Sequence, residues 1–163
     1  MNISNIYVSY ELSTTMFILN MKNYFFNNLI FLLGFFVLPL HAIERSIASN
    51  DAELYIISPI DGEVVKSPVK IVFGLKGMGV APAGIKFNNT GHHHLLINVD
   101  ELPDINLPIP SDDKHKHFGK GQTETVIELE PGQHSLQLIL GDHMHVPHNP
   151  VVVSKKIKIN VIK

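Results

Sequence analysis

The sequence lacks cysteine entirely among its 163 residues. This absence excludes disulfide bonds, thiolate metal sites, iron–sulfur clusters and cysteine nucleophiles. The sequence also lacks an excess of basic side chains, since 13 lysines and arginines stand against 15 acidic residues. Because nucleic-acid binding needs a basic surface, no nucleic-acid partner is expected. Tryptophan is absent and arginine is scarce, so side chains that dominate many protein–protein interfaces are nearly missing.

The longest apolar run, residues 29–40, is shorter than the ~20 residues that a membrane-spanning helix needs. It follows a short basic segment and ends just before Ala42, which is typical of a secretory signal peptide over residues 21–42. We expect cleavage after Ala42 and no stable membrane span afterwards. Residues 1–20 are then an upstream extension from a misplaced start codon. Residues 43–163 are long enough for one domain, in the periplasm or secreted.

Apolar and polar residues alternate over several short segments of this domain, the period typical of half-buried strands. The segments are 54–57, 69–75, 95–99, 125–129, 136–140 and 157–161. No stretch shows a helical period. Strands with one apolar face bury it against one another, which predicts an all-β fold, an antiparallel β-sandwich. Two connections, 77–91 and 101–121, are too long for plain turns and are either functional or disordered.

Four motifs are distributed over the domain. They are Gly77-Met-Gly-Val-Ala-Pro-Ala-Gly84, Gly91-His-His-His-Leu-Leu-Ile97, His117-Phe-Gly-Lys-Gly-Gln-Thr-Glu124 and Leu136-Gln-Leu-Ile-Leu-Gly-Asp-His-Met-His-Val-Pro-His148. With them the chain resembles the exported bacterial proteins of domain-of-unknown-function family 4399, a resemblance that implies export but no activity. Two further runs, Ser58-Pro-Ile-Asp-Gly-Glu-Val-Val65 and Pro131-Gly-Gln-His-Ser-Leu-Gln-Leu138, resemble bacterial immunoglobulin-like modules, which implies that the sandwich is immunoglobulin-like.

Histidine is the residue type that this sequence has in excess, since nine of its ten histidines lie between His92 and His148. Three pairs are spaced i, i+2: His92/His94, His115/His117 and His143/His145. Side chains at i and i+2 of an extended segment lie on the same face, so each pair can offer two imidazoles to one ion. His93 instead shares the parity of Leu95 and is expected in the core.

Neutral imidazole suits Cu(II) and Zn(II), which predicts that the domain binds one of these divalent metals, or a small ligand. The expected ligands are His92, His94, His115, His117, His143, His145 and His148, with Asp142 and Glu124 as carboxylate ligands or supporting partners. Two alternatives stay open: a metal-free interaction or adhesion module of the cell envelope, and a metal-dependent hydrolase. No nucleophile elbow, phosphate loop or metalloprotease helix is present, so no catalytic residue is assigned.

A shared metal site requires the three pairs to meet at one end of the sandwich. They meet only if the connection 101–121 climbs back along the strand that begins at His92; a direct hairpin would leave His92 a strand length away from His143. If several histidines share one ion, protons compete with it, and metal affinity is expected to fall below about pH 6.

Overall fold

The computed structural model describes residues 44–163, and these residues form strands and loops without a helix. The expected start extension (1–20) and signal peptide (21–42) lie outside the described residues. Within the described part of the chain, no helix is long and apolar enough to cross a membrane. The predicted all-β fold is confirmed.

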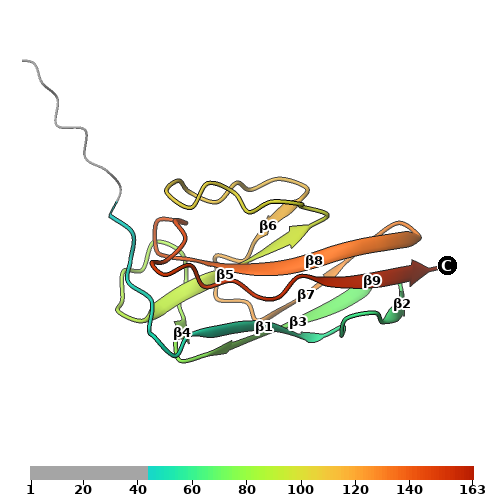
Figure 1. Cartoon of the computed structure of the whole chain (residues 1–163), viewed down its shortest axis with the longest axis horizontal. Helices are drawn as coiled ribbons and strands as arrows, with labels where there is room; N and C mark the ends of the chain where they lie inside the picture. The colour runs from blue at the N-terminus through green and yellow to red at the C-terminus, as the bar shows by residue number, and fades with distance from the viewer. Residues whose placement is uncertain (1–43) are drawn as a thin grey trace, which may run out of the picture. The chain divides into compact units, whose positions relative to one another are not determined.

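The described strands form two sheets (Figure 1). In chain order they are β1 (Glu53–Ser58), β2 (Val64–Lys66), β3 (Val69–Lys76), β4 (Gly79–Val80), β5 (Thr90–Ile97), β6 (His115–His117), β7 (Glu124–Ile127), β8 (Gly132–Gly141) and β9 (Ile157–Ile162). One sheet has three strands in the order β1-β3-β7. The other has six, in the order β2-β9-β8-β5-β4, with β6 also paired to β5.

The expectation of purely antiparallel pairing is wrong at two places. β2 runs parallel to β9, and β4 runs parallel to β5. A parallel pair cannot be closed by a tight turn and needs a longer connection. Residues 81–89 provide that connection between β4 and β5, whereas β2 and β9 come from opposite ends of the domain. The six-stranded sheet is therefore mixed.

The main core lies between the two sheets, where alternate residues of each long strand are buried. Ile71 and Phe73 of β3 face Leu95 of β5 and Leu138 of β8, and all four side chains are buried. His93 shares this face, as its parity predicts. Its ring centroid lies 5.1 Å from that of Phe73, and its Nδ1 is hydrogen-bonded to the carbonyl of Gln122 at 3.1 Å.

A second, smaller core lies on the outer face of the six-stranded sheet. There Leu96 of β5 and Ile139 of β8 pack against Ile109, which comes from the loop between β5 and β6. His92 and His94 alternate with His93 and so lie on the same face as Leu96. His92 and His94 thus lie outside the sandwich core, on the outer face of the sheet rather than between the sheets.

Candidate metal centre

Four imidazoles meet on the outer face of the six-stranded sheet, and we call His92, His94, His117 and His145 the histidine cluster. The ring centroids of His92 lie 4.9 Å from His94, 5.0 Å from His117 and 5.0 Å from His145. His117 lies 5.0 Å from His94 and 4.8 Å from His145. The widest separation is 6.1 Å, between His94 and His145. Three segments far apart in sequence therefore converge.

Nitrogen atoms of three of these rings are close enough to share an ion. One nitrogen each from His92, His94 and His117 lies within 4.8 Å of the other two. The Nε2 atoms of His92 and His94 are 3.0 Å apart, so without a metal one of them donates a hydrogen bond to the other. His145 is next to this triad by its ring, while its nitrogens lie outside the 4.8 Å set.

Two rings of the cluster are buried and two are half-buried, yet much of their hydrogen-bonding capacity is unused. His92 and His94 are fully buried, and Nδ1 of each has no hydrogen-bond partner. Nε2 of His117 is also buried without a partner. Buried polar atoms nearly always find partners, and each unpaired one costs about 1–3 kcal/mol. Three such atoms in one place indicate a site shaped for a ligand.

Burial also keeps these imidazoles neutral. Burial first, and then the neighbouring His145 and His117, lower the pKa of His92 to about 4. Burial lowers the pKa of His94 to about 2, with His92 as the next cause. The pKa of His117 is lowered by burial and then by His145. Because a metal binds only the unprotonated ring, these rings are ready to bind at neutral pH.

Strand pairing positions three of the four rings. His94 on β5 lies opposite His117 on antiparallel β6, and the amide of Phe118 donates to the carbonyl of His93 at 3.0 Å. The loop between β5 and β6 therefore climbs back along β5, the route that convergence requires. On the other side of β5, His92 lies opposite Gly141, the last residue of β8. The chain continues from there into the loop that carries His145.

Asp142 organises this loop. Its Oδ1 accepts hydrogen bonds from the amides of Met144 (2.8 Å) and Val146 (3.0 Å), and its Oδ2 accepts one from the Ser46 hydroxyl (2.7 Å). Burial raises the pKa of Asp142, but these hydrogen bonds outweigh it, so the pKa is lowered. His145 has a φ of 68°, a left-handed conformation uncommon outside glycine and typical of functional positions. Asp142 therefore supports the cluster without joining it.

A segment whose role the sequence did not reveal joins all the histidine-bearing segments. Residues 79–84, which we call the strap, donate a backbone hydrogen bond of 2.9 Å to each of these three segments. Ala81 donates to the carbonyl of Gly91, Ala83 to that of Gly119, and Gly84 to that of His143. Gly91 directly precedes His92, and Gly119 and His143 lie two residues from His117 and His145 in the chain. The small residues of the strap let its backbone come this close, and their run was the only signal in the sequence.

Two glycines make room for the rings. A Cβ atom on Gly119 would lie 2.3 Å from Cε1 of His117, and one on Gly141 would lie 3.0 Å from Nε2 of His94. Neither glycine has a left-handed φ, so the backbone itself does not demand glycine there. Their lack of a side chain is explained by the imidazoles that pack on them.

The family model described as "Domain of unknown function (DUF4399)" matches residues 71–162. The chain belongs to this family. No curated protein and no solved structure matches it. In this DUF4399 chain the matched residues contain the whole histidine cluster, the strap, and the glycines that pack on the rings.

Other predicted ligands lie beside the cluster of the DUF4399 domain. His115 is on β6 opposite Leu96, and its Nδ1 is bonded to Asp112 at 2.8 Å. His143 has its Nδ1 3.9 Å from Oδ2 of Asp142. Neither ring is among the four that meet.

Two more predicted ligands are engaged elsewhere. His148 is buried, and its Nε2 is hydrogen-bonded to the carbonyl of Thr90 at 3.1 Å. Glu124 is on β7 of the other sheet, exposed, and forms an ion pair with Lys70 at 3.0 Å. No carboxylate of the predicted set therefore faces the cluster as a ligand in this structure.

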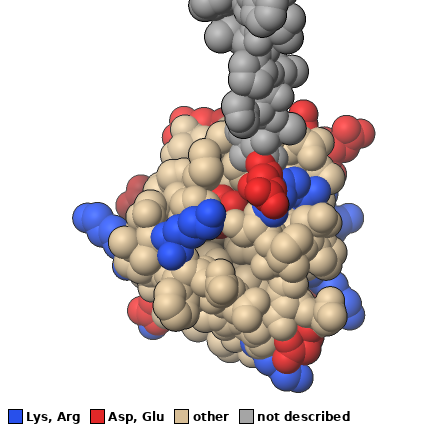
Figure 2. All heavy atoms as spheres, turned by 90° about the vertical axis from the view of Figure 1, so that its left-hand side faces the viewer, with Lys and Arg blue, Asp and Glu red and all other residues tan. Residues whose placement is uncertain are grey.

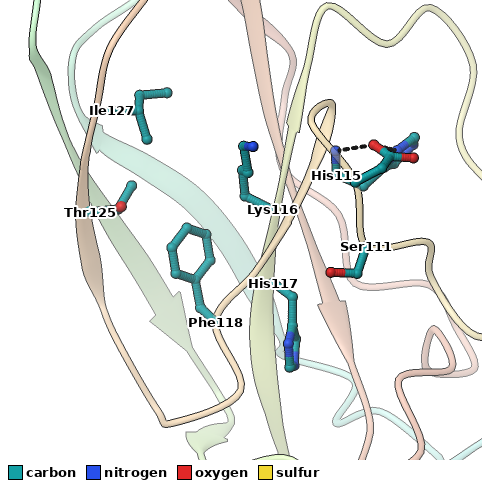
Figure 3. Close-up of a pocket in the computed structure, with 8 residues that line it drawn as sticks. Ser111, His115, Lys116, His117, Phe118, Thr125 and Ile127 are labelled. Atoms are coloured by element: carbon teal, nitrogen blue, oxygen red, sulfur yellow. Dashed lines mark hydrogen bonds and ion pairs between the residues drawn. The ribbon is translucent and has the colours of Figure 1, made fainter.

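A cleft of about 380 Å³ runs beside β6 and reaches His117. It is lined by Ser111, Asp112, His115, Lys116, His117, Phe118, Thr125 and Ile127. Figure 3 shows Phe118 and Thr125 on one side of β6 and His115 on the other. On the face of the domain that carries β4 and the loop after β8, most atoms belong to uncharged residues, and basic and acidic side chains are scattered among them (Figure 2).

Proposed function

We propose that this DUF4399 domain binds one divalent transition-metal ion through His92, His94 and His117, with His145 as a fourth ligand. The observation that carries the proposal is the buried triad, whose nitrogens lie within 4.8 Å of one another and are largely without partners. An all-imidazole donor set suits Cu(II), Zn(II) and Ni(II).

The ring positions fit one ion. The six centroid separations place the four ring centres on a sphere of about 3.2 Å radius, the distance expected for imidazoles with a Zn–N bond of about 2.0–2.1 Å. Four rings in mutual contact, with most centroids about 5 Å apart, can therefore surround one ion.

Copper is the favoured metal. The domain lacks a thiolate, and a set of neutral imidazoles generally binds Cu(II) more tightly than Zn(II). The expected signal peptide supports a site of action in the periplasm or outside the cell. The two-sheet fold supports the finer assignment as an immunoglobulin-like module.

Metal titration of the purified protein tests the proposal. We expect one equivalent of Cu(II) to bind, with Zn(II) binding more weakly. His94→Ala should lose at least the 10–100-fold in affinity that removal of even a supporting partner costs. His115→Ala is the matched control, since it removes a nearby histidine outside the cluster. Equal copper affinity for the protein and for His94→Ala would contradict the proposal.

The alternative is a metal-free interaction module, and one observation favours it. On the loop between β4 and β5, Phe87 and Ile85 are 72% and 56% exposed. This apolar pair is at the end of the strap and is available to a partner. The two functions separate in the titration, because an interaction module would show no stoichiometric metal uptake.

A further inference from the structure

We infer that residues 45–48 form an N-terminal clamp that positions the metal-binding loop, with Arg45 and Ser46 as its positioning residues. The metal-binding loop is residues 142–149, which follow β8 and carry His145. This inference rests on the proposed function, since it names residues that hold a proposed ligand in place rather than bind the ion. The clamp lies outside residues 71–162, so the metal-binding unit that we infer is larger than the matched domain.

The side chains of the clamp contact the metal-binding loop on both sides of its turn. Before the turn, the hydroxyl of Ser46 donates a hydrogen bond to Oδ2 of Asp142 at 2.7 Å. After the turn, the guanidinium of Arg45 donates from Nε to the carbonyl of Pro147 at 2.9 Å and from Nη2 to the carbonyl of His148. Hydrogen bonds from a charged donor are stronger than those between neutral groups. Two consecutive residues of the clamp therefore join the two ends of the turn.

Backbone pairing anchors the clamp beside the loop. The amide of Ala48 donates to the carbonyl of Asn149 at 3.0 Å, and the amide of Asn149 donates to the carbonyl of Ser46 at 2.9 Å. Ala48 is 3% exposed and belongs to the main core. The chain then enters β1 of the three-stranded sheet, whereas the loop follows β8 of the six-stranded sheet (Figure 1). The clamp therefore ties the loop to the core and to the opposite sheet.

His145 depends on its loop because strand pairing does not place it. β8 ends at Gly141, and His145 lies beyond it in a left-handed conformation, with a φ of 68°. The turn is held by Oδ1 of Asp142, while Ser46 occupies the other oxygen of the same carboxylate. Without the clamp, the loop adopts this conformation for a smaller fraction of the time, and the apparent metal affinity falls by that fraction.

Copper titration of clamp variants tests the inference. We expect Ser46→Ala to bind Cu(II) about tenfold more weakly than the unmodified protein, as for the loss of other partners that orient ligands. Ser46→Thr keeps the hydroxyl and should retain the affinity. Ser49→Ala is the matched control, because its hydroxyl bonds to Asp51 and not to the loop. Equal affinity in Ser46→Ala and Ser49→Ala would overturn the inference and leave the proposed function standing. A protein that binds no copper would sink both.

A core variant separates positioning from a general loss of stability. Ile159→Val removes one methylene from a buried side chain of β9, so it lowers the stability without changing the clamp. We expect this variant to bind copper as tightly as the unmodified protein does. If Ile159→Val and Ser46→Ala lose copper affinity equally, Ser46 has no positioning role and the inference is overturned.

Hydrogen exchange of the unmodified protein gives a second readout. If the docked clamp strengthens copper binding, copper must strengthen the docking of the clamp by the same factor. Mass spectrometry should therefore show exchange about tenfold slower with Cu(II) in peptides that contain Ala48 and Asn149. The short edge strand β2 is the control, and its exchange should stay the same. Equal exchange of the clamp with and without bound copper would overturn the inference, and this measurement decides if Ser46→Ala does not fold.

Discussion

The metal-free protein should lose stability in mild acid because its buried imidazoles resist protonation. His92 has a folded-state pKa of about 4, lowered by burial and by His145 and His117 from the ordinary histidine value of 6.5. Between pH 6.5 and 4 the unfolded chain therefore binds a proton that the folded chain does not. Stability from this group is complete above pH 6.5 and is lost as the pH falls toward 4.

The size of the effect follows from the same shift. One pKa unit corresponds to 1.36 kcal/mol, so His92 alone accounts for about 2 kcal/mol between pH 7.5 and pH 5, and about 3 kcal/mol by pH 4. His94 is lowered further, but its ring touches His92, so the two contributions do not simply add. A domain stability of about 5–15 kcal/mol makes a change of this size easy to detect.

Urea denaturation of the metal-free protein at pH 7.5 and pH 5 measures this loss. His92→Leu removes the titrating ring and its unpartnered Nδ1, so its pH-dependent loss should be smaller by about 2 kcal/mol. His134→Leu serves as the control, since that ring is bonded to the carbonyl of Glu130 at the far end of β8. If His92→Leu and the unmodified protein lose equal stability between the two pH values, the burial argument is refuted. Because the pKa of His92 is lowered, protons should compete with the metal for this ring only at a lower pH than the value near 6 that is expected for unperturbed histidines.

Two further substitutions test how the cluster is held. Gly119→Ala puts a Cβ within 2.4 Å of two atoms of the His117 ring. The affinity for copper should therefore fall by about tenfold or more, and the free energy of unfolding should change by about 1–3 kcal/mol. Calorimetric titration measures the affinity and urea denaturation the stability, and an unchanged affinity would show that His117 is no ligand. Asp142→Ala leaves the amides of Met144 and Val146 without an acceptor and should lower the free energy of unfolding by about 2–4 kcal/mol, with weaker copper binding. Asp142→Asn keeps an acceptor oxygen and should lose less on both counts; equal loss in the two variants would mean that the charge, not the acceptor, matters.

The long strands could be predicted from the sequence, and the short ones could not. The strands over residues 69–76 and 132–141 show a period of two because alternate side chains of each, such as Ile71 and Phe73 or Leu136 and Leu138, face the main core. β2, β4 and β6 have two or three residues each, too few for any period. Their places depend on partners distant in the chain, which is also why the parallel pairs were missed.

The candidate site shows the same division. The i, i+2 rule put His92 and His94 on one face, and the pairing of β6 with β5 supplied His117. The rule could not tell how far the loop between β5 and β6 climbs, and so could not separate His117, opposite His94, from His115, opposite Leu96. His145 rather than His143 meets the cluster because a turn held by Asp142 sends it inward, and nothing in the local sequence encodes that direction.

The proposed ion would explain an arrangement that lowers the stability of the free protein. Three buried nitrogens have no partner, and His92, His94 and His117 resist protonation. The glycines under the rings and the strap across their segments hold this costly arrangement in place. A selection for stability alone would replace the rings with apolar side chains, as Leu96 and Ile139 already do lower on the same face. An ion that binds the folded state offsets the cost, by about 4 kcal/mol at a thousandfold excess over its dissociation constant. The face of β5 is therefore divided: the part around Leu96 stabilises the fold, and the part at His92 and His94 is where we propose that the ion binds.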